Sequence, residues 1–452
     1  MKEKPPGLRF LGAFVRLVLG VFYRRVEVLG LERVPQGRPM VCVGNHVNSL
    51  LDPALLLGYL PLAPRFLAKS TLWSHPLVRP FIELASAIPV FRRQDEGVDT
   101  SKNAETFSRC HEVLKEGGTI AIFPEGRSHD EPALVPLKTG VSRIVLEAEA
   151  KYGGIGSCIL PVGLTFDDKT RFRSRALVHV GEPIEPAGEM AIYPQDPEEA
   201  VRSLTSRVQQ GLAAVTLNFP SWEEARLIQQ AAEIYSRPID QAPVERPLRA
   251  TFPLQRDFID GYHKLLARCP NEVEKATTAM REYREDLEEL RLEDAQVASL
   301  YPAGLVWRFV VKSLLLLGIF LPLGLLGTLL NFVPYKAAGV IARKVAPSSD
   351  TLATYKIFGS LIFYPFTWTL VATAAGHFLG FWPGLAAFLA CPLSGLFAVR
   401  YHQRQDYFFR QARAFLLLKS GRLSVAELKD KRQKVLEAIS RLVELYRAQE
   451  AT

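Results

Sequence analysis

The sequence predicts an α/β protein: a mostly parallel sheet with helices on both faces, followed by charged helices and a C-terminal helical membrane region. Three observations lead to this prediction. From residue 25 to about 181, short apolar runs alternate with helical stretches, which is typical of parallel strands covered on both faces. From about residue 194 to 300 these runs stop and charged segments replace them. After residue 305, uncharged segments long enough to enter a bilayer appear.

The N-terminal segment Leu8–Tyr23 is apolar at most positions but too short to cross a bilayer. Basic residues such as Arg9 and Arg24 lie within and beside it. Residues 1–24 are therefore predicted to form an amphipathic helix in the membrane interface. A helix packed against the main domain fits the same pattern equally well.

Seven apolar runs bounded by turn residues are predicted to be buried strands. They are Val26–Leu29, Met40–Gly44, Arg65–Ala68, Ile88–Phe91, Thr119–Phe123, Ile159–Leu164 and Leu177–Val180. Helical stretches lie between them, such as Ser101–Glu116, which ends before the helix-stopping pair Gly117-Gly118. We assign residues 25–215 to this α/β domain.

Outside the membrane region, the rest of the chain is predicted to be helical and charged, over residues 216–304 and as amphipathic helices over 401–452. Each segment contains an apolar seam with the three- and four-residue spacing of a helix that packs lengthwise against another. The seams are Val273, Ala276, Met280, Tyr283, Leu287 and Leu290, and Leu428, Val435, Ile439, Leu442 and Tyr446. Pairing of the two seams and two independent amphipathic helices both satisfy the pattern.

Two uncharged segments mark residues 305–400 as a membrane region. Ile357–Val399 has 43 residues without Lys, Arg, Asp or Glu, twice the length of one crossing, and predicts a helical hairpin that turns at Phe381–Gly384. Ser313–Val333 has 21 residues and is either one span or, because Pro322 weakens a straight helix, a re-entrant segment. We favour the re-entrant alternative because it keeps every basic stretch on the cytosolic side.

The chain is basic, with 55 Lys and Arg residues against 47 Asp and Glu residues and a net charge of +8. Nucleic acid and an anionic membrane surface both attract such a chain. The basic residues flank the apolar segments and do not interleave densely with aromatic residues. The lipid bilayer is therefore the predicted partner, and nucleic acid is not.

A histidine and an aspartate follow the predicted strand Met40–Gly44. Asn45-His46 comes directly after the strand, and Asp52-Pro53 predicts a helix that begins at Pro53 with Asp52 as its cap. His46 then lies at the carboxyl end of a strand, where open α/β sheets bind ligands. Such a pair can deprotonate a hydroxyl, because the aspartate orients the imidazole that takes the proton. Alone, this spacing also arises by chance.

Three further strand ends carry polar or turn-forming residues. One strand ends in Phe123-Pro124-Glu125-Gly126-Arg127-Ser128, where a glycine after an acidic residue indicates a backbone turn close to a ligand. Another, Ile88–Phe91, runs into Arg92-Arg93, whose guanidinium groups match the geometry of phosphate. The last is Ile159–Gly163, a buried run followed by turn residues.

In this order, the four blocks Asn45–Asp52, Ile88–Arg93, Phe123–Ser128 and Leu160–Gly163 resemble the glycerophospholipid acyltransferase family, over roughly residues 25–215. That family contains the 1-acyl-glycerol-3-phosphate and glycerol-3-phosphate acyltransferases. Five residues separate the histidine from the aspartate where four are usual, a spacing similar to the fungal-type glycerol-3-phosphate/dihydroxyacetone-phosphate acyltransferases. Arginine also stands at the third block where threonine is common, and both departures leave the acceptor open.

The resemblance implies a role for each block. In the first, His46 is the general base and Asp52 orients it. The other blocks bind the substrates. Arg92, which Arg93 could replace, and Arg127 bind phosphate. Glu125 and Gly126 shape the acceptor pocket, and Pro161 lies on the acyl-donor side.

The implied function is that of a membrane-bound O-acyltransferase of phospholipid biosynthesis, with residues 25–215 as its catalytic domain on the cytosolic face. It moves a fatty acyl group from an acyl-CoA or acyl-carrier-protein thioester to glycerol-3-phosphate or 1-acyl-glycerol-3-phosphate. The acceptor oxygen attacks the thioester directly, so neither a metal nor a cofactor is expected besides this co-substrate. A phospholipid-dependent transacylase and a non-catalytic membrane scaffold are the alternatives.

Overall fold

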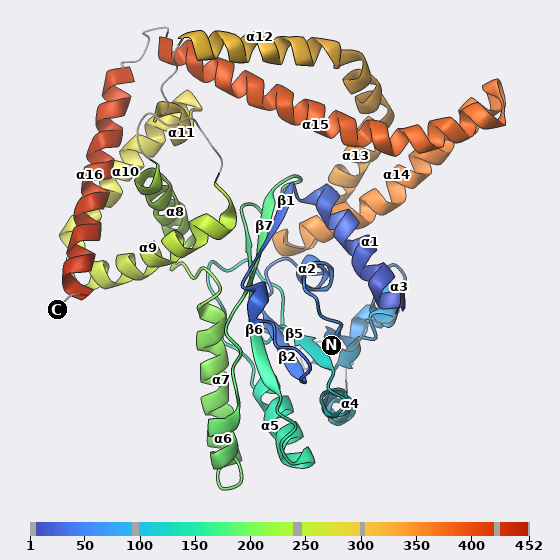
Figure 1. Cartoon of the computed structure of the whole chain (residues 1–452), viewed down its shortest axis with the longest axis vertical. Coiled ribbons are helices and arrows are strands. Elements are labelled where there is room, and N and C mark those ends of the chain that lie inside the picture. The colour runs from blue at the N-terminus through green and yellow to red at the C-terminus, as the bar shows by residue number, and fades with distance from the viewer. Residues whose placement is uncertain (1–5, 93–98, 238–245, 299–302, 420–424, 451–452) are drawn as a thin grey trace. The chain divides into compact units, whose positions relative to one another are not determined.

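The computed structural model describes residues 6–92, 99–237, 246–298, 303–419 and 425–450 (Figure 1). The chain forms two compact units. The first comprises Met1–Asn218 and Val345–Ile357, and the second comprises Phe219–Lys344 and Phe358–Thr452.

The first unit is built on a seven-stranded sheet, and every predicted strand is present in it. The strands are β1 Arg25–Leu29, β2 Met40–Gly44, β3 Pro64–Lys69, β4 Ile88–Val90, β5 Thr119–Ile122, β6 Cys158–Phe166 and β7 Arg175–Val180, in the order β1-β7-β6-β2-β5-β3-β4. All neighbouring pairs are parallel except the antiparallel pair β6 and β7. The predicted α/β fold class is confirmed.

Helices cover both faces of this sheet, because alternate residues of its strands face opposite sides. Cys42 of β2 belongs to the core cluster beneath α1 (Pro6–Phe22) and α2 (Leu51–Tyr59). Its neighbour Val43 belongs to the cluster beneath α4 (Asn103–Lys115), α5 (Gly140–Tyr152) and α7 (Pro197–Ala213). The helices of this unit are α1 Pro6–Phe22, α2 Leu51–Tyr59, α3 Arg79–Leu84, α4 Asn103–Lys115, α5 Gly140–Tyr152, α6 Ala187–Ile192 and α7 Pro197–Ala213, with short 3₁₀ turns η1 Leu31–Arg33, η2 Ser70–Ser74 and η3 Thr100–Lys102.

Helix α1 packs against the unit and also keeps an apolar outer face. Leu11 and Leu19 are buried in the core cluster, whereas Phe10 and Leu17 are exposed. The inner face of α1 therefore fits the alternative of a helix packed against the main domain. The outer face suits a helix in the membrane interface, and that role stays a prediction.

In the second unit, the two predicted seams pack against each other. One core cluster contains Tyr283 and Leu287 of α10 (Pro270–Leu290) together with Leu428 and Val435 of α16 (Val425–Glu450). This finding decides between the two alternatives in favour of pairing. The helices of this part are α8 Trp222–Ser236, α9 Leu248–Arg268, α10 Pro270–Leu290, α11 Asp294–Val297 and α16 Val425–Glu450.

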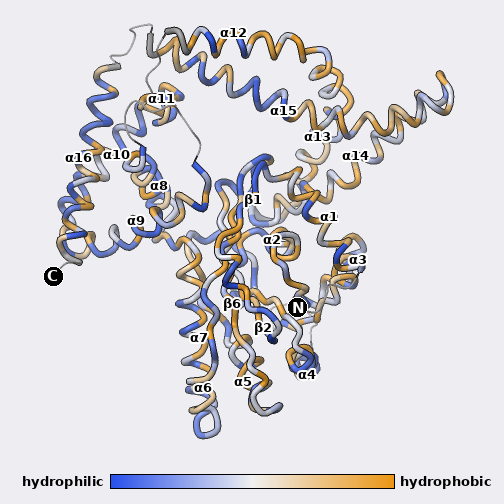
Figure 2. The backbone as a smooth tube through the Cα atoms, viewed as in Figure 1, coloured by the Kyte–Doolittle hydropathy of each residue, from blue (hydrophilic) through white to orange (hydrophobic). Residues whose placement is uncertain are grey.

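Four apolar helices precede α16: α12 Ala303–Ile319, α13 Leu321–Val345, α14 Ser349–Leu379 and α15 Phe381–Lys419. Hydrophobic residues predominate along much of their length (Figure 2). Within the described residues, three helices are long and apolar enough to cross a membrane: α13, α14 and the part of α15 up to Leu417. This agrees with the predicted membrane association.

Ser313–Val333 is interrupted next to Pro322, because α12 ends at Ile319 and α13 begins at Leu321. Its course as a spanning or a re-entrant segment stays a prediction. The predicted position of the hairpin turn is wrong. The hairpin turns at Gly380, which has φ 99°, and the predicted turn residues Phe381–Gly384 already belong to α15. Pro322 lies in the first turn of α13, and Pro383 lies in the first turn of α15. In the first turn of a helix the missing N–H of proline costs no helical hydrogen bond.

Candidate active site

His46 follows β2 and lies against the aromatic ring of Phe123, which follows β5. The two rings stack with centroids 4.4 Å apart and an angle of 20° between their planes. This arrangement requires Gly44 at the end of β2, because a Cβ there would lie 2.9 Å from the Phe123 ring. The sheet thus brings two strand ends together and fixes one face of the imidazole.

His46 forms a pair with Asp52 as predicted from the spacing. Its Nδ1 lies 2.9 Å from Oδ2 of Asp52, whose side chain is 0% exposed. Burial raises the pKa of Asp52, and the hydrogen bonds from His46 and from the backbone of Asn48 act in the opposite direction. When Nδ1–H donates to the carboxylate, Nε2 carries the free lone pair that a general base needs. The His46 side chain keeps 21% exposure.

The predicted start of the following helix is wrong. Helix α2 begins at Leu51 and not at Pro53, so Asp52 lies in its first turn and does not cap it. Oδ2 of Asp52 instead accepts a 2.7 Å bond from the backbone N–H of Asn48, which folds the connecting loop back over the carboxylate. Ser49 adopts φ 47° in this loop, and its N–H donates to Oγ of Ser128 at 3.0 Å.

Glu125 holds the backbone of His46 rather than its ring. Its Oε1 accepts from the His46 N–H at 2.7 Å, and its Oε2 contacts Nε2 of His129. The N–H of His129 in turn donates to the His46 carbonyl at 3.1 Å. Because Nδ1 of His129 accepts from the Glu131 N–H at 3.1 Å, the ring proton lies on Nε2 and points to Glu125. Both backbone groups of His46 are therefore clamped.

His129 is the site residue that the sequence analysis missed. It lies four residues after Glu125 in the same strand-end loop, and that shared loop was the available signal. Asn45, by contrast, belongs to the first block. It exchanges two hydrogen bonds with the backbone of Leu164, which ties the start of the loop to β6.

Basic groups gather at the Gly126 turn. Arg92, which follows β4, donates from Nη1 to the Gly126 carbonyl at 2.9 Å. Gly126 has φ 74°, and a Cβ there would lie 2.5 Å from Nζ of Lys138. Arg127 is exposed beside this turn. Arg93 lies outside the described residues.

Pro161 lies within β6, paired with Val43 of β2. Its ring is in close contact with Gly211 of α7, where a Cβ would meet it at 3.1 Å. The strand continues to Phe166, two residues beyond its predicted end at Leu164. Gly163 is required within it, because a Cβ there would lie 1.7 Å from the Val215 carbonyl oxygen. The role of Pro161 on the acyl-donor side stays a prediction.

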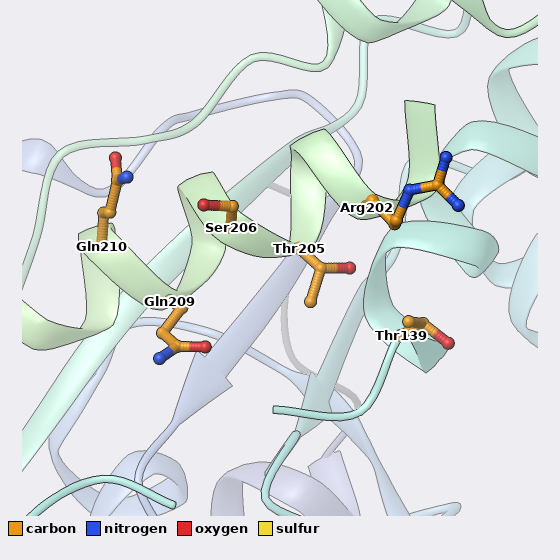
Figure 3. Close-up of a pocket in the computed structure, with 6 residues that line it drawn as sticks. All are labelled: Thr139, Arg202, Thr205, Ser206, Gln209 and Gln210. Atoms are coloured by element: carbon orange, nitrogen blue, oxygen red, sulfur yellow. The ribbon is translucent and has the colours of Figure 1, made fainter. Parts of the chain in front are cut away.

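A polar hollow lies elsewhere on the first unit, along α7 and the start of α5 (Figure 3). Its lining residues are Thr139, Arg202, Thr205, Ser206, Gln209 and Gln210. Arg202 is held there by ion pairs with Glu198 and Glu199. The hollow contains no base and orienting acid comparable to His46 and Asp52. Among the residues that the structure describes, no group of three or more His, Cys, Asp or Glu side chains is placed to hold a metal ion.

Known acyltransferases are similar to parts of the chain. Glycerol-3-phosphate O-acyltransferases 2 and 1 of Saccharomyces cerevisiae are 30% and 28% identical to it over 279 and 285 residues, which cover 58% and 59% of this chain and 37% of each relative. The chloroplastic 1-acyl-sn-glycerol-3-phosphate acyltransferase LPAT1 of Arabidopsis thaliana is 27% identical over 144 residues, 32% of this chain and 36% of the relative. The chain thus spans little more than a third of the length of these relatives.

Family comparisons agree with these likenesses. Residues 25–165 match the acyltransferase family. Residues 227–449 match the glycerol-3-phosphate acyltransferase 2 C-terminal domain. The resemblance predicted from the four strand-end blocks is confirmed: the chain is similar to the acyltransferase family over residues 25–165 and to the glycerol-3-phosphate acyltransferase 2 C-terminal domain over residues 227–449.

Proposed function

We propose that this chain is a membrane-bound O-acyltransferase that transfers a fatty acyl group from an acyl-CoA or acyl-carrier-protein thioester to glycerol-3-phosphate. The observation that carries the proposal is the His46–Asp52 pair, with its Nδ1 to Oδ2 distance of 2.9 Å. The Gly126 turn lies next to this pair, because Glu125 accepts from the His46 N–H and Arg92 donates to the Gly126 carbonyl. The matched C-terminal domain and the yeast relatives favour glycerol-3-phosphate as acceptor. The Arabidopsis relative makes 1-acyl-glycerol-3-phosphate the second candidate.

In the proposed mechanism, Nε2 of His46 takes the proton from the acceptor hydroxyl as its oxygen attacks the thioester carbonyl. Asp52 stabilises the imidazolium that forms. The C–S bond then breaks, and His46 returns the proton to the departing thiolate. One ester and one thiol result, so the step needs no oxidant, no metal and no acyl-enzyme. Glu125 and His129 keep the base in place by holding the His46 backbone.

The test is an assay of the purified full-length chain in detergent micelles. Acyl-CoA, acyl-carrier-protein thioester and phospholipid are offered as donors, each with glycerol-3-phosphate, dihydroxyacetone phosphate or 1-acyl-glycerol-3-phosphate. We expect the 1-acyl product from glycerol-3-phosphate with a thioester donor. Product from phospholipid alone would establish the transacylase instead, and a folded chain without product from any donor would establish the scaffold.

The basic groups at the Gly126 turn provide a prediction about the acceptor. Arg92→Ala and Arg127→Ala are each expected to raise the acceptor KM roughly 10-fold or more, because a hydrogen bond to a charged group contributes about 1.5–3 kcal/mol. The donor KM should change little in steady-state kinetics. Arg202→Ala, in the separate polar hollow, is the matched control and should leave both constants unchanged. An unaltered acceptor KM in both site variants would move the phosphate site, with Lys69 and Lys138 next to be tested.

We also propose that the chain is anchored in a membrane with its catalytic unit on the cytosolic face. The three long apolar helices support the anchoring. The connection between α13 and α14 belongs to the catalytic unit, since Val345–Ile357 is part of it. An even number of crossings before Val345 is therefore favoured, as the positive-inside tendency also suggests for this basic stretch.

Labelling of single cysteines tests this topology. In a background without the five native cysteines, Ser348→Cys should resist an impermeant maleimide in intact cells and react after lysis. Trp382→Cys lies where α14 ends and α15 begins, at the far end of α14 from Ser348. It should react before lysis and serves as the positive control. Reaction of Ser348→Cys in intact cells would require an odd number of crossings.

A further inference from the structure

The beginning of the long apolar helix α14 is built into the catalytic unit. Val345–Ile357 belongs to the same compact unit as the sheet. Ala353 is 0% exposed and lies in the core cluster that also contains Leu51 and Leu55 of α2, and Ile357 packs against that cluster. The first turns of α14 thus share a core with the helix that carries Asp52.

Polar contacts extend from these turns toward the His46 loop. Oγ of Ser349 donates to Oδ2 of Asp130 at 2.5 Å, and Nζ of Lys169 lies 2.6 Å from Oδ1 of the same carboxylate. Burial opposes ionisation of Asp130, but the bonds from Lys169 and Ser349 outweigh it and lower its pKa. Further along α14, Nζ of Lys356 donates to the Thr170 carbonyl at 2.6 Å. The helix therefore contacts Asp130, the carboxylate that pairs with Lys169, and the carbonyl of Thr170, the residue that follows Lys169.

The Lys169 ammonium completes the connection to the catalytic pair. It donates to the Val47 carbonyl at 2.8 Å and to the His129 carbonyl at 3.3 Å. Val47 is the residue after His46, and His129 holds the His46 carbonyl through its own N–H. All three donor sites of the ammonium are thus engaged, one with the carboxylate and two with the backbone around the base.

We infer that Ser349 and Lys356, in the first turns of α14, are positioning residues of the active site, which act through Asp130 and Lys169 on the loop that carries His46. The inference rests on the proposed function for its kinetic part. It places part of the site far outside the matched acyltransferase domain, which ends at residue 165.

The geometry of α14 allows both roles in one helix. Its remainder, Phe358–Leu379, has about 22 residues and a length of roughly 33 Å at about 1.5 Å per residue. A bilayer core is about 30 Å thick. The helix can therefore cross the membrane after it leaves the catalytic unit, and its membrane anchor is continuous with an element that orders the active-site loop.

The test compares Ser349→Ala/Lys356→Met with Ser349→Thr/Lys356→Arg, which keeps a hydroxyl and a cation. In the full chain, the first variant should lower kcat roughly 10- to 100-fold by misplacing the base, with both KM values and the melting temperature unchanged. The conservative variant should restore kcat. Ser348→Ala is the matched control, because its hydroxyl contacts that of Thr351 in the same turn and, among the described residues, has no hydrogen bond to Asp130 or Lys169.

Hydrogen exchange gives a second result that does not depend on activity. The amides of His46, Asn48 and Ser49 are all hydrogen-bonded in the loop. They should exchange faster in the Ser349→Ala/Lys356→Met variant, while the β6 peptide keeps its protection. Unchanged exchange, unchanged kcat, or a loss that the conservative variant does not restore would each overturn the inference. An inactive wild-type chain would reject the proposed function instead, and exchange alone would then decide whether α14 orders the loop.

Discussion

Replacing His46 by alanine is expected to lower kcat by about 10²–10⁴-fold, because general-base catalysis contributes a factor of this size. The variant also leaves the buried carboxylate of Asp52 without its imidazole partner, although the Asn48 N–H bond remains. Steady-state kinetics of the purified chain with the best donor and acceptor pair measures the effect.

The matched control for this prediction is His75→Ala, since His75 is an exposed histidine of the same unit. It should keep wild-type kcat. Asp52→Asn keeps the shape of the pair but removes the charge that orients the ring, so it should be nearly as damaging as His46→Ala. A His46→Ala variant that retained a tenth of the activity would remove this residue from the mechanism.

The largest expected effect on stability lies in the second unit, at the buried ion pair of Asp294 and Arg432. Arg432 of α16 is 1% exposed, and its Nε lies 2.8 Å from Oδ1 of Asp294. Tyr283 of α10 donates to the same oxygen at 3.0 Å, and burial, together with this carboxylate, raises the pKa of Tyr283. The carboxylate thus links α10, α11 and α16.

Asp294→Ala is expected to destabilise this unit by about 3–5 kcal/mol, because it leaves the Arg432 charge buried and uncompensated. The melting temperature in detergent should fall by roughly 6–20 °C, since about 1 kcal/mol corresponds to roughly 2–4 °C for a unit of this size. Asp286→Ala is the matched control. It removes the partner of Lys431 between α10 and α16, but both side chains are about a third exposed, and such pairs contribute at most about 1 kcal/mol. Equal shifts in the two variants would contradict the account.

The strands could be predicted because a buried strand appears in the sequence as a short run of consecutive apolar residues. All five residues of β2 are buried, so Met40–Gly44 reads as one apolar run, and its predicted bounds agree with the structure. The order of the strands and the antiparallel pairing of β6 with β7 have no such local signature. The strand order and this pairing depend on tertiary contacts between strands that are far apart in the sequence.

Errors arose where the partner of a residue cannot be read from the local pattern. Asp52 was expected to cap a helix, but its oxygen is used by His46 and by the loop backbone. The strand β6 was expected to end at Leu164, but it continues to Phe166, where it pairs with Ala176 of β7. The contacts of Ser349 and Lys356 with the catalytic unit join residues 186 to 219 positions apart, and no spacing rule reaches that far.

The most direct test of the proposed general base is the pH dependence of kcat/KM in the wild type and in His46→Ala. In the wild type, log kcat/KM should rise with a slope of about one on the acid side, because a general base acts only in its unprotonated form. The acceptor phosphate also titrates near pH 6, but it does so with both proteins, so the comparison isolates the histidine. We predict that the residual activity of His46→Ala lacks the additional acid limb. Superimposable profiles in the two proteins would contradict general-base catalysis by His46.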